Sequence, residues 1–111
     1  MNMKLVAHVD DDPTQRAFMK LMFKNKFKNV ELHQFDSFKA LRESQYESFD
    51  FLISDNDTKE ETNGYNTCLY WPGKSVLLTG SYETDLTGNL FPIFSKTDVK
   101  EFFEWLQERL K

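Results

Sequence analysis

Short apolar segments alternate with amphipathic segments along the chain, and most apolar segments end at a polar residue. Short runs rich in β-branched and aromatic residues are typical of buried strands. Five such runs predict strands at Leu5–Val9, Val30–Phe35, Phe49–Ser54, Ser75–Leu78 and Phe91–Phe94. Because Pro92 has no amide hydrogen to donate to a neighbouring strand, the last run is expected at an edge of the sheet.

Helical spacing of apolar residues predicts helices between and after these strands. The expected helices cover Pro13–Phe27, a short segment from Phe38, Tyr65–Trp71, and a final segment from Val99. The inner face of the first helix is expected to consist of Ala17, Phe18, Leu21, Met22 and Phe27. That of the last helix is expected to consist of Val99, Phe102, Phe103, Leu106 and Leu110. Trp105 lies off that face, which makes it a candidate contact for a partner.

Strands that alternate with helices favour an α/β fold with a parallel sheet covered on both faces. In such sheets the ligand site lies at the carboxyl ends of the strands. Polar residues stand at four of these ends, namely Asp10 and Asp11, Asp55, Thr79, and Lys96. We therefore expect carboxylates, a hydroxyl and an ammonium group to gather at one edge of the sheet.

Length and charge narrow the class of protein further. A chain of 111 residues predicts one domain, 1–111, with a core that needs no disulfide. Five carboxylates lie in two groups, Asp10–Asp12 and Asp55 with Asp57, and removing them from a net charge of −4 leaves +1. The charge therefore argues against a nucleic-acid partner, and no apolar run is long enough to cross a membrane. The single cysteine, Cys68, indicates a reducing compartment.

Four further polar residues are assigned structural roles. Asp12, followed by Pro13, is interpreted as a helix cap rather than a third metal ligand. Cys68 and His8 are expected in the core, and His33 on the surface of a strand. Two histidines at unrelated spacing predict no metal site.

In four segments that include the polar residues at the strand ends, the chain resembles the receiver domain of bacterial two-component response regulators. The matching segments are VDDDPTQR (Val9–Arg16), FDFLISD (Phe49–Asp55), SVLLTG (Ser75–Gly80) and FSK (Phe94–Lys96). They occur in the family's order and extend over nearly the whole chain. The resemblance implies a flavodoxin-like three-layer sandwich with a five-stranded parallel sheet of order 2-1-3-4-5.

The same resemblance implies a role for each polar residue at the strand ends. Asp55 matches the phosphoacceptor, and Asp10 and Asp11 match the acidic pair that holds Mg²⁺. The backbone carbonyl of Asp57 would complete the metal site. Two further residues, Thr79 and Lys96, match the switch hydroxyl and the phosphoryl-binding lysine. A carboxylate can form an aspartyl phosphate, and this reaction needs mainly charge neutralisation.

Two departures from the family pattern concern the loops around the site. Thr58 and Lys59 stand where the family usually has a Met/Leu-Pro pair, and Gly64 comes one residue late, so the metal-binding carbonyl is expected to be displaced. Thr97 follows Lys96 where the family usually has proline, so the lysine is expected to be aimed differently.

Two further departures concern the signalling face. The position three residues before Lys96 is Ile93, where the family usually has an aromatic residue. Only sixteen residues separate Thr79 from Lys96. That length predicts that the family's fourth helix is missing or reduced to a turn, and that the output surface differs.

Three functions remain to be compared. The leading hypothesis is a stand-alone, cytoplasmic receiver that takes a phosphoryl group from a histidine kinase or phosphotransfer protein and signals to an unknown protein partner. The alternative is a pseudo-receiver that binds proteins without phosphorylation. An enzyme is not expected. The segment from Asp55 is similar to the nucleophile motif of haloacid-dehalogenase-like phosphatases, but Lys59 replaces their threonine and also excludes an EF-hand.

Overall fold

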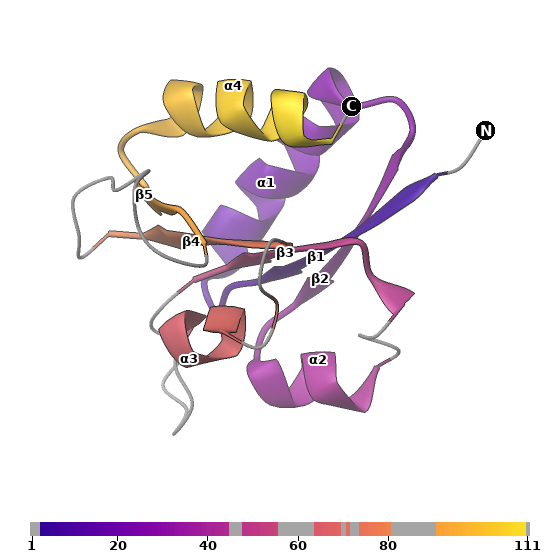
Figure 1. Cartoon of the computed structure of the whole chain (residues 1–111), viewed down its shortest axis with the longest axis vertical. Coiled ribbons are helices and arrows are strands. Elements are labelled where there is room, and N and C mark those ends of the chain that lie inside the picture. The colour runs from indigo at the N-terminus through magenta and orange to yellow at the C-terminus, as the bar shows by residue number, and fades with distance from the viewer. Residues whose placement is uncertain are drawn as a thin grey trace.

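In the computed structural model, the described residues form four helices and a five-stranded sheet, arranged in three layers (Figure 1). The structure describes residues 3–44, 48–55, 64–69, 71, 74–80 and 91–110. The strands are β1 (Lys4–Val9), β2 (Val30–Phe35), β3 (Phe51–Ser54), β4 (Ser75–Thr79) and β5 (Ile93–Ser95). The helices are α1 (Pro13–Lys26), α2 (Phe38–Glu43), α3 (Gly64–Leu69) and α4 (Val99–Arg109).

The sheet is parallel throughout and has the order β2-β1-β3-β4-β5. The predicted strand order is therefore confirmed, and β5 lies at an edge as Pro92 indicates. Helices α1 and α4 cover one face of the sheet, and α2 and α3 cover the other (Figure 1). Because all strands run the same way, their carboxyl ends share one edge of the sheet.

Alternating residues of the strands divide the core into two layers. Val6, Ile53 and Val76 point toward α1 and α4, where they pack with Phe102, Phe103 and Leu106. The neighbouring strand residues Ala7, Leu52 and Leu77 point the other way, where they pack with Phe38, Leu41 and Cys68. This burial on both faces explains why the central strands are mostly apolar, with His8 of β1 as a buried polar exception. The predicted core position of Cys68 is confirmed.

The inner face predicted for the first helix is wrong in part. Met19 and Phe23 are the buried residues of α1, whereas Ala17, Phe18 and Leu21 are exposed. The predicted face contains Phe18, and the observed face contains the next residue, Met19. Both residues are apolar, so the helical spacing alone does not show which face is buried. Contact with the sheet selects Met19 and Phe23, while the ring of Phe18 lies at the margin with its centroid 6.4 Å from that of Phe103.

The apolar face predicted for the last helix is confirmed, and the assignment of Trp105 is wrong. Phe102, Phe103 and Leu106 are buried, and Val99 and Leu110 pack against the same core cluster. The ring of Trp105 is half-buried rather than free for a partner. Its centroid lies 5.9 Å from that of Phe51 and 5.5 Å from that of Phe94. The large indole reaches the core from the margin of the helix face.

Two predicted strands begin too early. Before β3, the backbone of Asp50 donates to Leu5 O at 2.7 Å, but regular pairing starts only at Phe51. Before β5, the carbonyl of Pro92 accepts from Leu77 N at 3.0 Å, and the strand follows from Ile93.

The predictions for two loops lie outside the described residues. These are the loop that carries Asp57 and residues 81–90, which include the segment where a fourth family helix would stand. Among the described residues, no helix is assigned between β4 and β5. None of the described helices has the length and apolar character needed to span a membrane.

Candidate functional site

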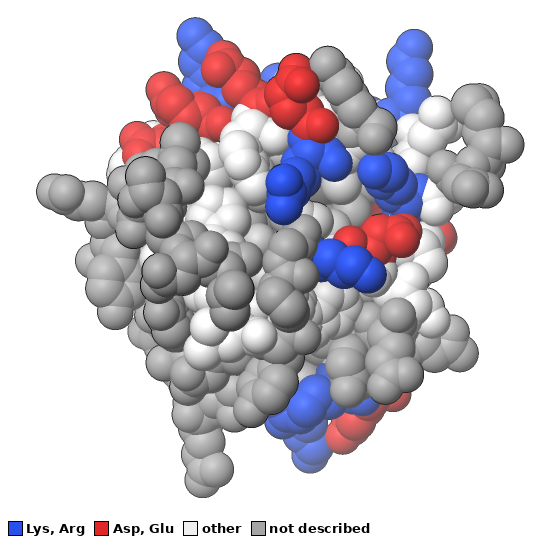
Figure 2. All heavy atoms as spheres, viewed as in Figure 1, with Lys and Arg blue, Asp and Glu red and all other residues white. Residues whose placement is uncertain are grey.

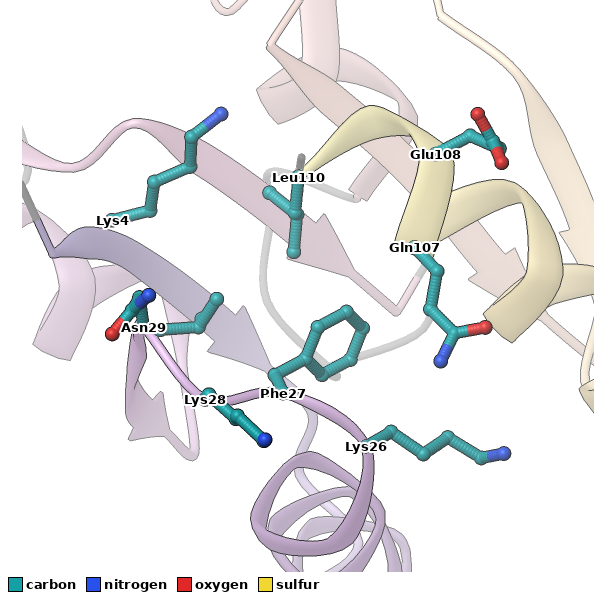
Figure 3. A pocket seen from close by; sticks show the side chains of 9 residues that line it. Lys4, Lys26, Phe27, Lys28, Asn29, Gln107, Glu108 and Leu110 are labelled. Carbon is teal, nitrogen blue, oxygen red and sulfur yellow. The ribbon is translucent and has the colours of Figure 1, made fainter.

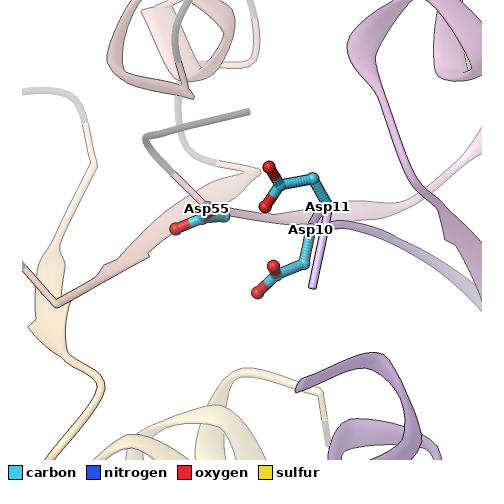
Figure 4. Close-up of side chains that lie close together, drawn as sticks. All are labelled: Asp10, Asp11 and Asp55. Carbon is cyan, nitrogen blue, oxygen red and sulfur yellow. The ribbon is translucent and has the colours of Figure 1, made fainter. Parts of the chain in front are cut away.

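Three carboxylates meet where β1 and β3 end. Asp10, Asp11 and Asp55 each offer an oxygen, and these oxygens lie within 4.8 Å of one another (Figure 4). Asp10 and Asp55 are 1% and 6% exposed, and Asp11 is half-buried. Buried like charges at this separation repel one another, so the arrangement is stable only with cations nearby. Asp10 and Asp11 thus lie beside Asp55, whereas Asp12 is exposed and Asp57 lies outside the described residues.

Asp10 is fixed at every polar atom. Its amide donates to Phe35 O at 3.1 Å, and its carbonyl accepts from Arg16 Nη1 at 2.7 Å. In the carboxylate, Oδ1 accepts from Asp12 N at 2.9 Å, and Oδ2 lies 3.3 Å from Lys96 Nζ. Asp12 in turn caps α1, because its Oδ1 accepts from Thr14 N at 2.9 Å. The predicted capping role of Asp12 is confirmed.

Asp55 is fixed mainly through its backbone. Its amide donates to Val9 O at 2.9 Å, which continues the pairing of β3 with β1. Its carbonyl accepts from the Ser54 hydroxyl at 2.9 Å. The first residue of α3, Gly64, packs directly on this carbonyl: a Cβ there would overlap Asp55 O and lie 2.7 Å from the carbonyl carbon. Only glycine allows α3 to begin this close to the strand end.

Lys96 supplies the resident positive charge of the site. Its Nζ lies 3.0 Å from Asp55 Oδ1 and 3.3 Å from Asp10 Oδ2. Burial acts to lower the pKa of Lys96, but the hydrogen bond from Nζ to Asp55 and the charges of both carboxylates outweigh it and raise the pKa. The lysine is therefore charged at neutral pH and bridges the two strand ends.

The expectation that Thr97 changes the aim of Lys96 is not borne out. The turn after β5 is held by serine instead of by proline: Thr97 N donates to Ser95 Oγ at 3.2 Å, and the two hydroxyl oxygens lie 2.8 Å apart. The backbone of Lys96 itself donates to Thr79 O at 2.9 Å. These contacts hold the turn at the sheet edge, and the side chain of Lys96 reaches both carboxylates.

Thr79 ends β4 at the same edge of the sheet. It is 2% exposed and pairs in register with Ser95 of β5. The structure therefore places all the described residues of the predicted site at the carboxyl ends of neighbouring strands. Ile93, which stands where an aromatic partner was expected from the family pattern, is half-buried against the α2 and α3 side of the core. Asp57 lies outside the described residues.

The donor set suits a hard divalent cation. Carboxylate oxygens are the ligands that Mg²⁺ prefers, and two or three of them with several waters complete its coordination. The carboxylate of Asp11 forms no ion pair with any described residue, and Asp10 and Asp55 share one lysine. Three carboxylates against one ammonium leave the group negative, so Asp10, Asp11 and Asp55 fit Mg²⁺.

The sequence analysis did not predict the hydrogen-bonded pair of His8 in β1 and Gln34 in β2. His8 is 1% exposed, which confirms its expected core position, and its Nδ1 accepts from Gln34 Nε2 at 3.1 Å. The same amide nitrogen donates to Arg16 O at 2.7 Å. Burial, with the charges of Lys96 and Arg16, lowers the pKa of His8 to about 3, so the ring is neutral. One feature could have indicated this pair: a polar residue occurs at corresponding positions of the two adjacent strands, His8 in β1 and Gln34 in β2.

A pocket lies at the opposite edge of the sheet, near the amino ends of β1 and β2. It has a volume of about 620 Å³ and is lined by Lys4, Lys26, Phe27, Lys28, Asn29, Val30, Gln107, Glu108 and Leu110 (Figure 3). The amino groups of Lys4, Lys26 and Lys28 point in different directions (Figure 3). Acidic side chains gather over α4 in Figure 2, with basic side chains beside them. Neither feature brings reactive groups together as the strand ends do.

Comparison with known proteins identifies the class of fold. No protein family and no curated protein matches the chain by sequence. Among solved structures, a response regulator receiver domain protein from Bacillus halodurans C-125 matches with a TM-score of 0.74. The alignment has 15% identity and covers 97% of each chain.

Two further structures support the same class. A CheY-like receiver domain protein from Methanospirillum hungatei JF-1 has a TM-score of 0.68 and 18% identity, over 98% of this chain and 94% of the other. The RcsB response regulator of Salmonella typhimurium has a TM-score of 0.70 and 19% identity, over 97% of this chain and 62% of RcsB. This chain therefore has the fold of response-regulator receiver domains, as its motifs predict.

Proposed function

We propose that this chain is a phosphoryl-accepting receiver that works with Mg²⁺ and carries its signal on Asp55. The observation that supports the proposal is the position of the Asp55 carboxylate. It lies 3.0 Å from Lys96 Nζ and within 4.8 Å of ligand oxygens from Asp10 and Asp11. A nucleophile, a cation and a metal-binding pair thus occur in one buried group, at the site that the fold class uses for ligands.

The proposed reaction is the transfer of one phosphoryl group. An Asp55 carboxylate oxygen bonds to the phosphorus of a phosphohistidine, or of a small phosphodonor. The bond from phosphorus to the donor nitrogen or oxygen breaks, and the leaving group keeps the electron pair. Asp10, Asp11 and Asp55 would hold Mg²⁺, which would supply charge neutralisation for the phosphoryl oxygens.

In this proposal, Lys96 and Thr79 bind the phosphoryl group on Asp55. The ammonium of Lys96 pairs with Asp55 before the reaction and with a phosphoryl oxygen after it, because a phosphoryl group carries more negative charge than a carboxylate. The Thr79 hydroxyl donates a hydrogen bond to another phosphoryl oxygen. The backbone amide of Lys96 donates a hydrogen bond to the carbonyl of Thr79. A movement of either residue is therefore transmitted to the ends of both β4 and β5.

The proposal includes partners and a location. A histidine kinase or a phosphotransfer protein supplies the phosphoryl group, and a protein partner recognises the altered surface. The phosphorylated chain is itself the signal, so we do not propose an enzyme. The cytoplasm is the proposed compartment, because ATP-dependent kinases act there and the buried thiol of Cys68 needs no disulfide partner.

The test is the intact mass of the protein after incubation with a small-molecule phosphodonor and Mg²⁺. We expect one added phosphoryl group on the wild-type chain and none on Asp55→Asn. Asp36→Asn, which changes an exposed carboxylate to the same degree, is the matched control and is expected to be labelled normally. Omission of Mg²⁺ is expected to prevent labelling.

The second candidate function is phosphorylation-independent protein binding. The departures at Thr58 and Lys59 support it, because they lie in the loop that follows Asp55. An unlabelled wild-type chain, under conditions that label an ordinary receiver, would contradict the first proposal and favour this one.

A further inference from the structure

We infer that His8, Gln34 and Arg16 form a polar brace that positions Asp10 for Mg²⁺, and that Arg16 and Gln34 are positioning residues of the site. The inference rests on the proposed function, since it concerns the metal of that function. It adds residues that touch neither metal nor phosphoryl group. The brace is defined by hydrogen bonds that leave β1, pass through β2 and α1, and return to Asp10, the residue that follows β1.

The first part of the brace joins the two strands to the helix. His8 and Gln34 face each other in the parallel register of β1 and β2. The Gln34 amide nitrogen has two hydrogens, and it donates one to His8 Nδ1 at 3.1 Å and one to Arg16 O at 2.7 Å. This assignment places the histidine's own hydrogen on Nε2. Both donors of one side chain are thus used to hold the first turn of α1 beside the strands.

The second part of the brace returns from the helix to the site. Arg16 Nη1 donates to the carbonyl of Asp10 at 2.7 Å, a short hydrogen bond from a charged donor. Asp10 begins the turn into α1, and its carboxylate accepts from Asp12 N at 2.9 Å. The backbone of Asp10 is therefore held from α1 while its carboxylate is held from Asp12 and Lys96. Movement of Arg16 would release the turn that carries both Asp10 and Asp11.

Charge and positioning make opposite predictions for Arg16. Its positive charge near the carboxylates repels Mg²⁺, so loss of the charge alone would tighten Mg²⁺ binding. Loss of positioning would weaken Mg²⁺ binding, because residues that orient metal ligands typically contribute about tenfold or more to affinity. Gln34 has no charge, so its replacement changes positioning alone.

The experiment measures the Mg²⁺ dissociation constant by titration calorimetry and the hydrogen exchange of the Asp12 and Thr14 amides without Mg²⁺. The variants are Gln34→Met, Arg16→Met and Arg16→Lys, with Arg42→Met as the control. Arg42 lies exposed on α2, so its variant loses the same charge away from the brace. Unfolding temperatures of all variants are recorded in parallel.

We expect Gln34→Met to raise the Mg²⁺ dissociation constant by about tenfold and to speed exchange at both amides. Arg16→Met is expected to do the same despite its lost charge, Arg16→Lys to recover part of the affinity, and Arg42→Met to change neither quantity. Lower unfolding temperatures with an unchanged dissociation constant and unchanged exchange would overturn the inference. So would tighter Mg²⁺ binding in Arg16→Met.

The two proposals fail in different ways. A wild-type chain that binds no Mg²⁺ would overturn the proposed function. The exchange rates of the Asp12 and Thr14 amides would then still decide whether the brace holds the turn, since they are measured without metal.

Discussion

The ends of β1 and β3 lie side by side in the sheet, and their two aspartates share Lys96 but are otherwise held by different means. At the end of β1, polar side chains fix Asp10: Arg16 and Lys96 donate to it, and so does the Asp12 amide. At the end of β3, Lys96 pairs with the Asp55 carboxylate, and strand pairing and the close approach of Gly64 hold the Asp55 backbone. Hydrogen bonds from Arg16 and the Asp12 amide distinguish the first aspartate, and the steric contact of Gly64 with the backbone carbonyl distinguishes the second.

The difference suits the two proposed roles. A metal ligand must accept a cation without losing its place, and a network of hydrogen bonds can adjust in small steps. A nucleophile that gains a bulky phosphoryl group needs a rigid backbone behind it, and a glycine packed on the carbonyl supplies that rigidity. The following predictions test this contrast, beginning with the largest effect.

The thiol of Cys68 reports whether α3 stays packed on β3. Burial raises the pKa of Cys68 to about 12, against smaller opposing effects of hydrogen bonds with Ser75 and Ser54. Because only the thiolate reacts, the raised pKa and the burial of the sulfur slow disulfide exchange at pH 8 relative to an ordinary thiol. We expect the native rate to keep rising above pH 9, where the rate of the chain unfolded in guanidinium levels off. The rates are measured with an aromatic disulfide reagent.

Equal rates for the native and the unfolded chain at pH 8 would contradict the packing of α3 described above. Cys68→Ser is the blank, since the chain has a single cysteine.

Gly64→Ala tests the steric contact at β3. The added methyl group would overlap Asp55 O and lie 2.8 Å from Ser54 Oγ, so α3 must move away from the strand. We expect the free energy of unfolding to fall by about 1–3 kcal/mol, as for an overpacked core, and Cys68 to react faster. Urea unfolding measures the first effect. Gly80→Ala is the matched control, because a Cβ there meets nothing within 4 Å; an equal loss in both variants would refute the steric argument.

Asp12→Ala tests a hydrogen bond at the end of β1. The substitution removes the acceptor for Thr14 N and leaves the start of α1 without its cap. Loss of a helix cap typically lowers the free energy of unfolding by about 1 kcal/mol, and we expect that loss in urea unfolding. Asp12→Asn keeps a capping oxygen and is expected to restore most of it. An unchanged stability of Asp12→Ala would show that the cap contributes nothing there.

Asp11→Asn gives the smallest expected effect on stability, and its sign is opposite. Asp11 is the carboxylate of the group that pairs with no described cation, so its removal relieves repulsion from Asp10 and Asp55. We expect the unfolding temperature without Mg²⁺ to rise by about 2 °C, and the stabilisation by added Mg²⁺ to disappear. Scanning calorimetry with and without Mg²⁺ measures both. A variant that Mg²⁺ still stabilises as it does the wild-type chain would exclude Asp11 as a ligand.

The strand ends could be predicted from the sequence because each apolar run stops at a polar residue. That pattern located Asp10, Asp55, Thr79 and Lys96 at one edge of the sheet, and the structure brings them there. The face of α1 could not be predicted, because Phe18 and Met19 are adjacent and both apolar. Only contact with the sheet decides which of them is buried.

The supports of the site were harder to predict than its charged residues. The hydrogen bonds of His8, Gln34 and Arg16 join residues that are far apart in the sequence, and no local pattern announces them. The missing proline after Lys96 predicts a different orientation of the lysine side chain. The Ser95 hydroxyl instead holds the turn, because it accepts a hydrogen bond from the backbone of Thr97. Such substitutions preserve geometry with different chemistry, so a motif comparison registers them as losses.

The ion pair between Lys96 and Asp10 joins residues that are 86 positions apart. In any partly folded chain in which β1 and β3 are paired and β5 is not, the carboxylates of Asp10 and Asp55 lie together without the ammonium of Lys96. Such a chain therefore has a self-repelling edge. Docking of β5 both extends the sheet and brings a positive charge to that edge, so the outermost strand also relieves the repulsion between the two inner strand ends.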